Sequence, residues 1–166
     1  MTRFRKLILV ILILFVCTGC DRVTKNVAQK KLATSAPISL LNDTIRIEYT
    51  ENPGAMLNLG AKLPGEVRLV FFVIFVGLML AFTLVYAVKA HGVNSIQLIG
   101  LSLITSGGIG NFLDRLINKG VAIDFMNIGI GPIRTGIFNV ADLFIVAGIF
   151  IFILSSIKSQ REAVKT

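Results

Sequence analysis

Three aspartates lie in or beside apolar stretches of the chain, and these three could do chemistry. Asp114 closes the run GGIGNFLDR at residues 107–115, Asp124 lies in VAIDF at 121–125, and Asp142 ends FNVAD at 138–142. Acids at such places are costly and need an explanation. Two carboxylates a few Å apart share one proton, so the ionised partner can activate water while the protonated one donates to a carbonyl oxygen. The same residues could equally bind a cation or relay protons.

Sequence context favours one pair among the three acids. Asp114 stands next to Arg115, and we interpret it as a structural anchor that positions Arg115 and the end of a helix. Asp124 has no cation beside it in the sequence, and Asp142 lies one helical turn after Asn139. We therefore favour Asp124 and Asp142 as the pair that shares a proton.

The composition identifies the kind of element that must position these acids. Of 166 residues, 54% are hydrophobic and 16% charged, and the mean hydropathy is +0.80. Soluble domains are about 25% charged, so we infer an integral membrane protein. The net charge of +8 comes without a basic stripe interleaved with aromatic residues, which favours lipid headgroups over nucleic acid as the acidic neighbour. One histidine and two cysteines are too few for a typical zinc site.

Four segments are long and apolar enough to span a bilayer, which takes about 20 residues of helix. The predicted spans cover residues 7–28, 68–89, 95–115 and 137–157 of a single membrane-embedded domain, 1–166. Lysine and arginine gather in the short flanks of the spans, and this bias predicts that both termini are cytoplasmic. These flanking residues are Arg3, Arg5, Lys6, Lys89, Lys158, Arg161 and Lys165.

The two outer connections are predicted to form a small β platform at about 37–62 and 119–136. Thr44 to Tyr49 reads TIRIEY, an alternation of polar and apolar residues that is typical of a strand. Asn52-Pro53-Gly54 then ends the strand. The apolar run from Val121 to Ile128 has a similar character.

The N-terminal region resembles a secretory signal that ends in a lipid-modified cysteine, Cys20. We favour an ordinary first span, because signal h-regions and short spans overlap in length. A helix that continues past Cys20 places Asp21 and Lys25 at i,i+4 as an ion pair. Cys17 and Cys20 are then interpreted as small apolar packing residues. The alternative is that the chain is itself a lipoprotein modified at Cys20.

Five motifs in order resemble bacterial lipoprotein signal peptidase (signal peptidase II), an intramembrane aspartic peptidase, over essentially the whole chain. They are DRVTK at 21–25, ENPGA at 51–55, GGIGNFLDR at 107–115, IDF at 123–125 and FNVAD at 138–142. The resemblance implies an α-helical integral membrane protein with four transmembrane helices and a small extracytoplasmic β platform. It places the protein in the bacterial cytoplasmic (inner) membrane, with the active site near the outer face.

The same resemblance implies an activity and a set of site residues. The enzyme would cut prolipoproteins N-terminal to a cysteine that carries diacylglycerol, with water and no metal or cofactor, as a monomer among membrane lipids. Asp124 and Asp142 would be catalytic, and an older reading of the family pairs Asp114 with Asp142 instead. The residues implied to bind substrate or support the site are Asn52, Gly54, Gly108, Asn111, Arg115 and Asn139. The residues implied to be structural are Asp21, Lys25 and Asp114.

One departure from the family pattern concerns the platform. Pro53 follows Asn52 and biases it toward an extended conformation, which bears on the direction of the Asn52 side chain.

Two other classes of protein fit the same acids. A small transporter or proton-relay protein would predict ion flux, and an inactive scaffold would predict binding of precursors without cleavage.

Overall fold

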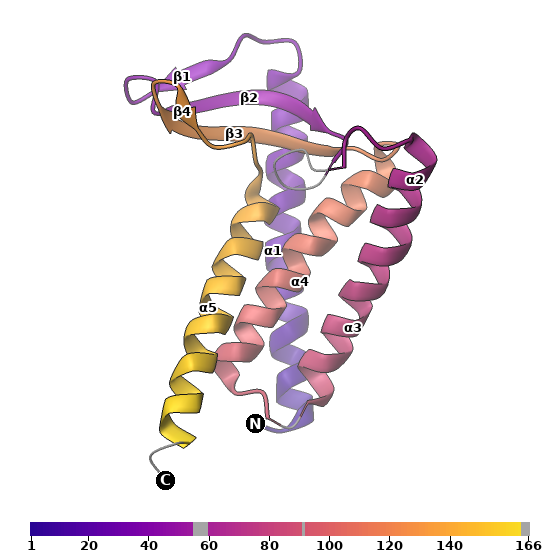
Figure 1. Cartoon of the computed structure of the whole chain (residues 1–166), viewed down its shortest axis with the longest axis vertical. Coiled ribbons are helices and arrows are strands. Elements are labelled where there is room, and N and C mark those ends of the chain that lie inside the picture. Colours follow the sequence, from indigo (N-terminus) through magenta and orange to yellow (C-terminus); the bar gives the residue numbers. More distant parts are fainter. Residues whose placement is uncertain (55–59, 91, 164–166) are drawn as a thin grey trace.

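The computed structural model describes residues 1–54, 60–90 and 92–163. Within these residues, four helical segments are long and apolar enough to cross a membrane (Figure 1). They are α1 (Arg3–Leu32), a composite helix of α2 (Gly65–Leu69), η2 (Val70–Phe75) and α3 (Val76–Lys89), then α4 (Ser95–Ile117) and α5 (Val140–Ala163). Residues 55–59 of the expected platform and the flanking Lys165 lie outside the described residues.

A small antiparallel sheet lies across one end of the helices, and both termini lie at the other end (Figure 1). Its strands are β1 (Ile38–Leu40), β2 (Ile45–Asn52), β3 (Ala122–Ile130) and β4 (Ile133–Arg134), in the order β1-β2-β3-β4. The predicted fold class, four spanning helices with a small β platform, is confirmed. The strand predicted at 44–49 runs on to Asn52 and ends before Pro53, which has no N–H to donate to a ladder.

The first helix is continuous across both cysteines. Thr2 caps its start, and it runs to Leu32 without a break at Gly19. Cys17 is buried, as expected of a packing residue, but Cys20 is exposed, so that interpretation is wrong for Cys20. The buried face of α1 continues from Cys17 to Asp21 and Lys25 in steps of four residues, and Cys20 points about 100° away from Asp21 around the helix axis.

Small residues bring α4 and α5 into close contact. A Cβ atom added to Gly100 would lie 2.8 Å from the carbonyl oxygen of Gly148, and one added to Gly148 would lie 2.6 Å from that of Gly100. A Cβ on Gly107 would similarly collide with the carbonyl oxygen of Ala141. The glycines therefore let two membrane helices approach at backbone distance.

The second spanning segment contains a π-helical stretch, η2, between two α-helical parts. Such wide turns are rare and are often found at functional sites. Here the stretch carries Phe72, whose buried ring faces the cavity described below.

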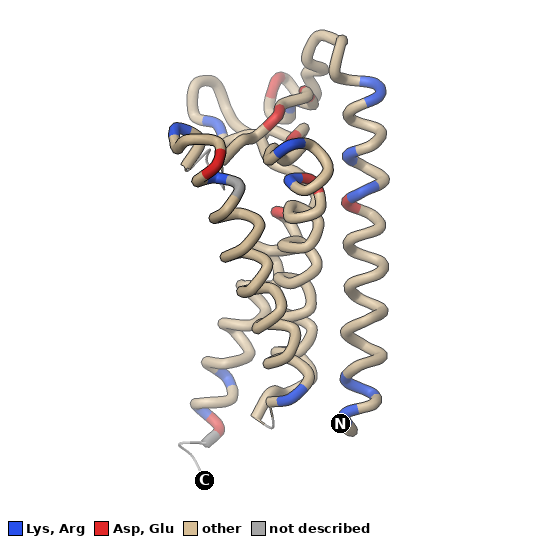
Figure 2. The backbone as a smooth tube through the Cα atoms, turned by 90° about the vertical axis from the view of Figure 1, so that its right-hand side faces the viewer, with Lys and Arg blue, Asp and Glu red and all other residues tan. Residues whose placement is uncertain are grey.

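Charged residues gather toward the two ends of the helices, and the middle sections carry none (Figure 2). At the end that holds the termini, the ammonium of Lys6 donates to the carbonyl oxygens of Ala90 (3.0 Å) and Val93 (3.4 Å). This lysine ties the start of α1 to the connection between α3 and α4.

Candidate active site

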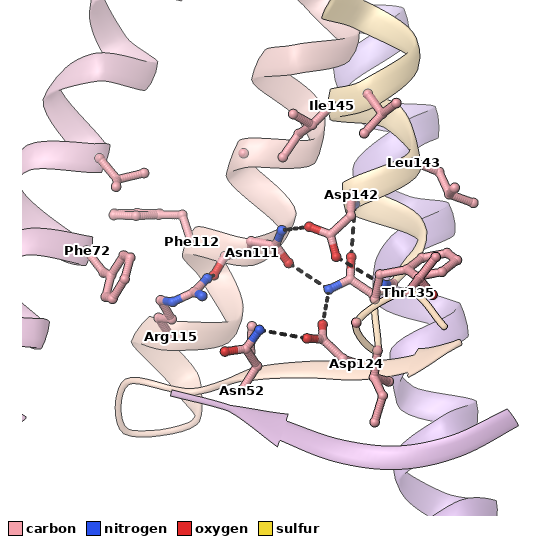
Figure 3. Close-up of a pocket in the computed structure, with 18 residues that line it drawn as sticks. Asn52, Phe72, Asn111, Phe112, Arg115, Asp124, Thr135, Asp142, Leu143 and Ile145 are labelled. Carbon is pink, nitrogen blue, oxygen red and sulfur yellow. Dashed lines mark hydrogen bonds between the residues drawn. The ribbon is translucent and has the colours of Figure 1, made fainter. Parts of the chain in front are cut away.

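A cavity of about 530 Å³ opens where the sheet meets the nearby ends of α4 and α5 (Figure 3). Most of its wall is apolar, contributed by residues such as Phe72, Phe112 and Ile145. The polar side chains that line it are two carboxylates, three amides, one guanidinium and one hydroxyl. They belong to Asn52, Asn111, Arg115, Asp124, Thr135, Asn139 and Asp142.

The two carboxylates reach the cavity from different elements. Asp124 lies on β3 and is 2% exposed, and Asp142 lies in the first turn of α5. Both oxygens of Asp124 accept hydrogen bonds, from Asn52 Nδ2 (2.9 Å) and Asn139 Nδ2 (2.6 Å). The extended backbone at Asn52 therefore aims this side chain at Asp124, and Pro53 does not prevent the contact.

Asp142 belongs to a reciprocal cap at the start of α5. The backbone N–H of Asn139 donates to Asp142 Oδ2 (3.0 Å), and the backbone N–H of Asp142 donates to Asn139 Oδ1 (3.1 Å). This capping box satisfies two N–H groups that the helix itself cannot bond.

Two amides connect the carboxylates. Asn111 Nδ2 donates to Asp142 Oδ1 (2.8 Å), and Asn139 Nδ2 donates both to Asp124 and to Asn111 Oδ1 (2.9 Å). Each polar side-chain atom of the two amides that faces the acids takes part in a hydrogen bond. The arrangement holds Asp124 and Asp142 at one place with fixed side-chain orientations.

The environment of Asp124 favours its protonated form. Burial raises the pKa of Asp124 from its ordinary value of 3.8 to about 6, and the charge of Asp142 adds to the rise. The hydrogen bonds from Asn52 and Asn139 oppose it. Asp124 thus titrates within reach of neutral pH, as the proton-sharing member of an acid pair must.

A buried ionic cluster lies behind the cavity and joins α1 to three other elements. Lys25, which is fully buried, contacts Asp21 Oδ2 (2.9 Å), Asp114 Oδ2 (2.8 Å) and Asn111 Oδ1 (3.0 Å). Arg22 also pairs with Asp114. The two acids extend the cluster, because Asp21 accepts from the backbone N–H of Ala141 on α5 and Asp114 from that of Ile123 on β3.

Arg115 connects α4 with the end of β2. Its guanidinium donates to the backbone carbonyls of Asn111 and Gly54 and lies 4.6 Å from the ring centre of Phe72. A cation over an aromatic face is stabilised by the ring quadrupole. The residue thereby closes one side of the cavity.

The structure brings together most of the predicted site residues and separates the rest. Asp21, Lys25 and Asp114 form the cluster behind the cavity rather than part of its wall. The carboxylate of Asp114, which the sequence suggests as an anchor for Arg115, pairs directly with Lys25, Arg22 and the backbone N–H of Ile123. The predicted residues that line the cavity are Asn52, Gly108, Asn111, Arg115, Asp124, Asn139 and Asp142.

Two contributors escaped the sequence analysis. Arg22 lies inside the DRVTK run. Its partner Asp114 is 92 residues further along the sequence, so no local pattern indicates the pair. Phe72 is one of 12 phenylalanines, and nothing in its neighbours marks it. In the ranges 1–54, 60–90 and 92–163, no group of three or more His, Cys, Asp or Glu side chains could hold a metal ion.

Comparison with known proteins gives consistent matches along the chain. The family model described as Signal peptidase (SPase) II matches residues 12–158. The lipoprotein signal peptidase of Borrelia hermsii is 29% identical over 158 residues, which cover 92% of each chain. That of Halothermothrix orenii is 31% identical over 146 residues, covering 88% of this chain and 93% of the relative. A solved bacterial membrane enzyme superposes with a TM-score of 0.78 at 26% identity, covering 91% of this chain and 88% of its own.

Proposed function

We propose, from the premise that this chain belongs to the signal peptidase II family, that Asp124 and Asp142 are the catalytic dyad of an aspartic endopeptidase. Family membership makes the protein a multi-pass protease of the inner membrane that processes the signal peptides of prolipoproteins. The aspartic mechanism is our proposal. The observation that carries it is the pair of amides that joins the two carboxylates at one cavity.

In the proposed reaction, a water molecule lies between the two acids. Asp142, as the ionised member of the pair, takes a proton from this water, and the water oxygen attacks the scissile carbonyl carbon. Asp124, whose raised pKa favours the protonated form, donates its proton to the carbonyl oxygen. Asp142 then passes its proton to the leaving nitrogen, the C–N bond breaks, and Asp124 recovers its proton from the hydroxyl of the new carboxyl group.

The remaining polar residues of the cavity position the acids and the peptide. Asn52, Asn111 and Asn139 hold the carboxylate oxygens by hydrogen bonds, so little reorganisation is needed when the charge moves. Arg115 and the carbonyl of Gly54 hold the end of β2 against α4. Gly108 lines the cavity and lets α3 pack closely against α4, since a Cβ atom there would collide with the side chain of Leu80.

We further propose that the substrate is cut N-terminal to a diacylglyceryl-modified cysteine while its acyl chains stay in the surrounding lipid. Residues 1–166 would act as one membrane-embedded domain and as a monomer. Both termini would be cytoplasmic and the cavity would lie near the outer face. This orientation is supported by the shared position of the termini opposite the sheet and by the basic residues near them (Figures 1 and 2).

A cleavage assay tests the dyad directly. Purified wild type, Asp124→Asn, Asp142→Asn and Asp114→Asn would each receive a diacylglyceryl-modified prolipoprotein in detergent, and release of the signal peptide would be followed by gel shift. We expect wild type to cleave and both dyad variants to fail. Cleavage by Asp124→Asn but not by Asp114→Asn would instead support the pair Asp114 and Asp142. If wild type fails to cleave, ion flux in liposomes and precursor binding become the next tests.

A further inference from the structure

The part of the sheet formed by β1, β4 and the segments of β2 and β3 that pair with them has two faces that differ completely in chemistry. Residues paired across antiparallel strands share a face, and so do residues two apart along a strand. The register pairs Ile38 with Ile47 and Met126, Leu40 with Ile45 and Ile128, and Ile130 with Ile133. These eight residues, here called the apolar sheet face, include no polar side chain.

The opposite face is polar, and its side chains hydrogen-bond to one another. The register places Ser39, Arg46 and Asn127 in one row, with Arg134 opposite Gly129. Asp43 in the β1–β2 turn accepts from Ser39 Oγ (2.8 Å) and Arg46 Nε (2.7 Å). A sheet that is polar on one side and wholly aliphatic on the other separates two media.

The position of the sheet relative to α5 shows what lies next to the apolar sheet face. The N–H groups of Phe125 and Met126 both donate to the carbonyl oxygen of Phe138 (3.0 and 2.9 Å), so β3 is irregular where it passes the head of α5. Beyond this irregularity, strands β1 and β4 and their turns extend past the upper end of α5 (Figure 1). The apolar sheet face therefore lies next to the space that lipid occupies beside α5.

This face is exposed and continuous with the lipid-facing surface of the helices. Ile130 and Ile133 at its tip are 79% and 81% exposed. At its inner end Met126 pairs with Phe138, which leads into α5 and its exposed Leu143. Contiguous apolar patches of this kind mark interaction surfaces.

We propose that the apolar sheet face inserts into the outer-leaflet interface of the bilayer, with Ile130 and Ile133 deepest. The continuity with α5 and the polar opposite face favour lipid over a protein partner. The consequence is positional, because β3 carries both the inserted tip and Asp124. Insertion of the tip then fixes the height of Asp124 relative to the membrane surface.

The chain contains no tryptophan, so single tryptophans can report depth. Ile133→Trp would probe the tip, Ser39→Trp the polar face of the same sheet, and Phe150→Trp the exposed side of α5 within the span. The proteins would be placed in phosphatidylcholine vesicles formed in iodide solution. Iodide, which quenches tryptophan fluorescence from the water, is then present on both sides of the membrane. Brominated acyl chains would quench from the lipid.

We expect bromolipid to quench Ile133→Trp and Phe150→Trp, and iodide to quench Ser39→Trp several-fold more than Ile133→Trp. Equal iodide quenching of Ile133→Trp and Ser39→Trp would overturn the proposal. Shielding that appears only after precursor is added would assign the face to substrate, and shielding that grows with protein density would assign it to a second copy. Neither readout depends on the peptidase assignment.

A second variant tests the positional consequence. Ile133→Asp places a charge on a side chain that is already 81% exposed, so the fold should survive. We expect it to lower cleavage several-fold in vesicles and to leave cleavage unchanged in detergent, with Ile133→Leu unchanged in both. Equal activity of Ile133→Asp and wild type in vesicles would contradict a role of insertion in placing Asp124.

Discussion

The ammonium of Lys25 lies 3.0 Å from the side-chain oxygen of Asn111 and determines which way that amide faces. Lysine can only donate, so the amide oxygen must face Lys25 and the nitrogen must face Asp142. The same oxygen accepts from Asn139, whose nitrogen also reaches Asp124. One buried cation on α1 therefore orients both amides that hold the proposed dyad.

Replacing Asn111 by aspartate tests this arrangement. The new carboxylate can still accept from Lys25, but it cannot donate to Asp142 and adds a like charge beside it. We expect kcat to fall by about 10²-fold, the scale of losing one positioned donor, with little change in Tm. Asn26→Asp is the matched control, because it adds the same charge at an exposed position on α1. Equal kcat values for the two variants would contradict the role of the amide.

Asp114→Asn should act on stability. The change removes the carboxylate that pairs with Arg22 and one of the two that pair with the buried Lys25, and breaking a buried ion pair typically costs about 3–5 kcal/mol. We expect a clear drop in Tm, measured by thermal unfolding in detergent. Glu162→Gln removes an exposed 4.0 Å pair with Lys158 and should change stability by less than about 1 kcal/mol. Lost activity at an unchanged Tm would instead indicate that Asp114 takes part in the chemistry.

The raised pKa of Asp124 predicts how stability depends on pH. The folded state binds this proton more tightly than the unfolded chain, because the pKa rises from 3.8 to about 6. The contribution is fully present below about pH 4 and is lost as the pH rises through about 6, a change of about 3 kcal/mol. Unfolding of wild type between pH 4 and 7 would measure it. Asp124→Asn should lose this part of the slope, and an identical slope would contradict the assignment.

The crossing of α4 and α5 should not accept a methyl group. In Gly148→Ala the new Cβ would lie 2.6 Å from the carbonyl oxygen of Gly100, so the helices must separate. Overpacking of this kind costs about 1–3 kcal/mol. Gly19→Ala is the control, because no atom lies within 4 Å of its Cβ position and alanine is the better helix former. Tm values in detergent would separate the two, and equal values would show that the helices adjust freely.

Part of the proposed site could be predicted because its spacing is local, whereas Asn111 is 31 residues from Asp142 and entered only through the family resemblance. Asn139 and Asp142 are three residues apart and form a capping box, a pattern that a sequence displays directly. The ion pair of Asp21 and Lys25 follows from one helical turn in the same way. Alternation along residues 44–49 likewise revealed the core of β2.

Long-range features could not be predicted. Strands β1 and β4 have three and two residues and exist only through their pairing with β2 and β3. The run VFFVIF of η2 has the pattern of any apolar helix, so its π-helical form has no local signal. The direct partners of Asp114 could not be inferred from its neighbour Arg115, because adjacent residues on a helix point about 100° apart. Its cations come from α1, which only the packing of α1 on α4 reveals.

The buried ionic cluster also sets an order of assembly during synthesis. Asp21, Arg22 and Lys25 carry one excess positive charge and are translated well before Asp114, whose carboxylate brings the cluster to neutrality. Until α4 enters the membrane, the upper turns of α1 need water or headgroups around them, since unpaired charges are costly in hydrocarbon. The backbone N–H of Ala141 on α5 then completes the coordination of Asp21. We therefore expect nascent chains that stop before residue 114 to hold their first helix at a shallower depth than the finished protein does.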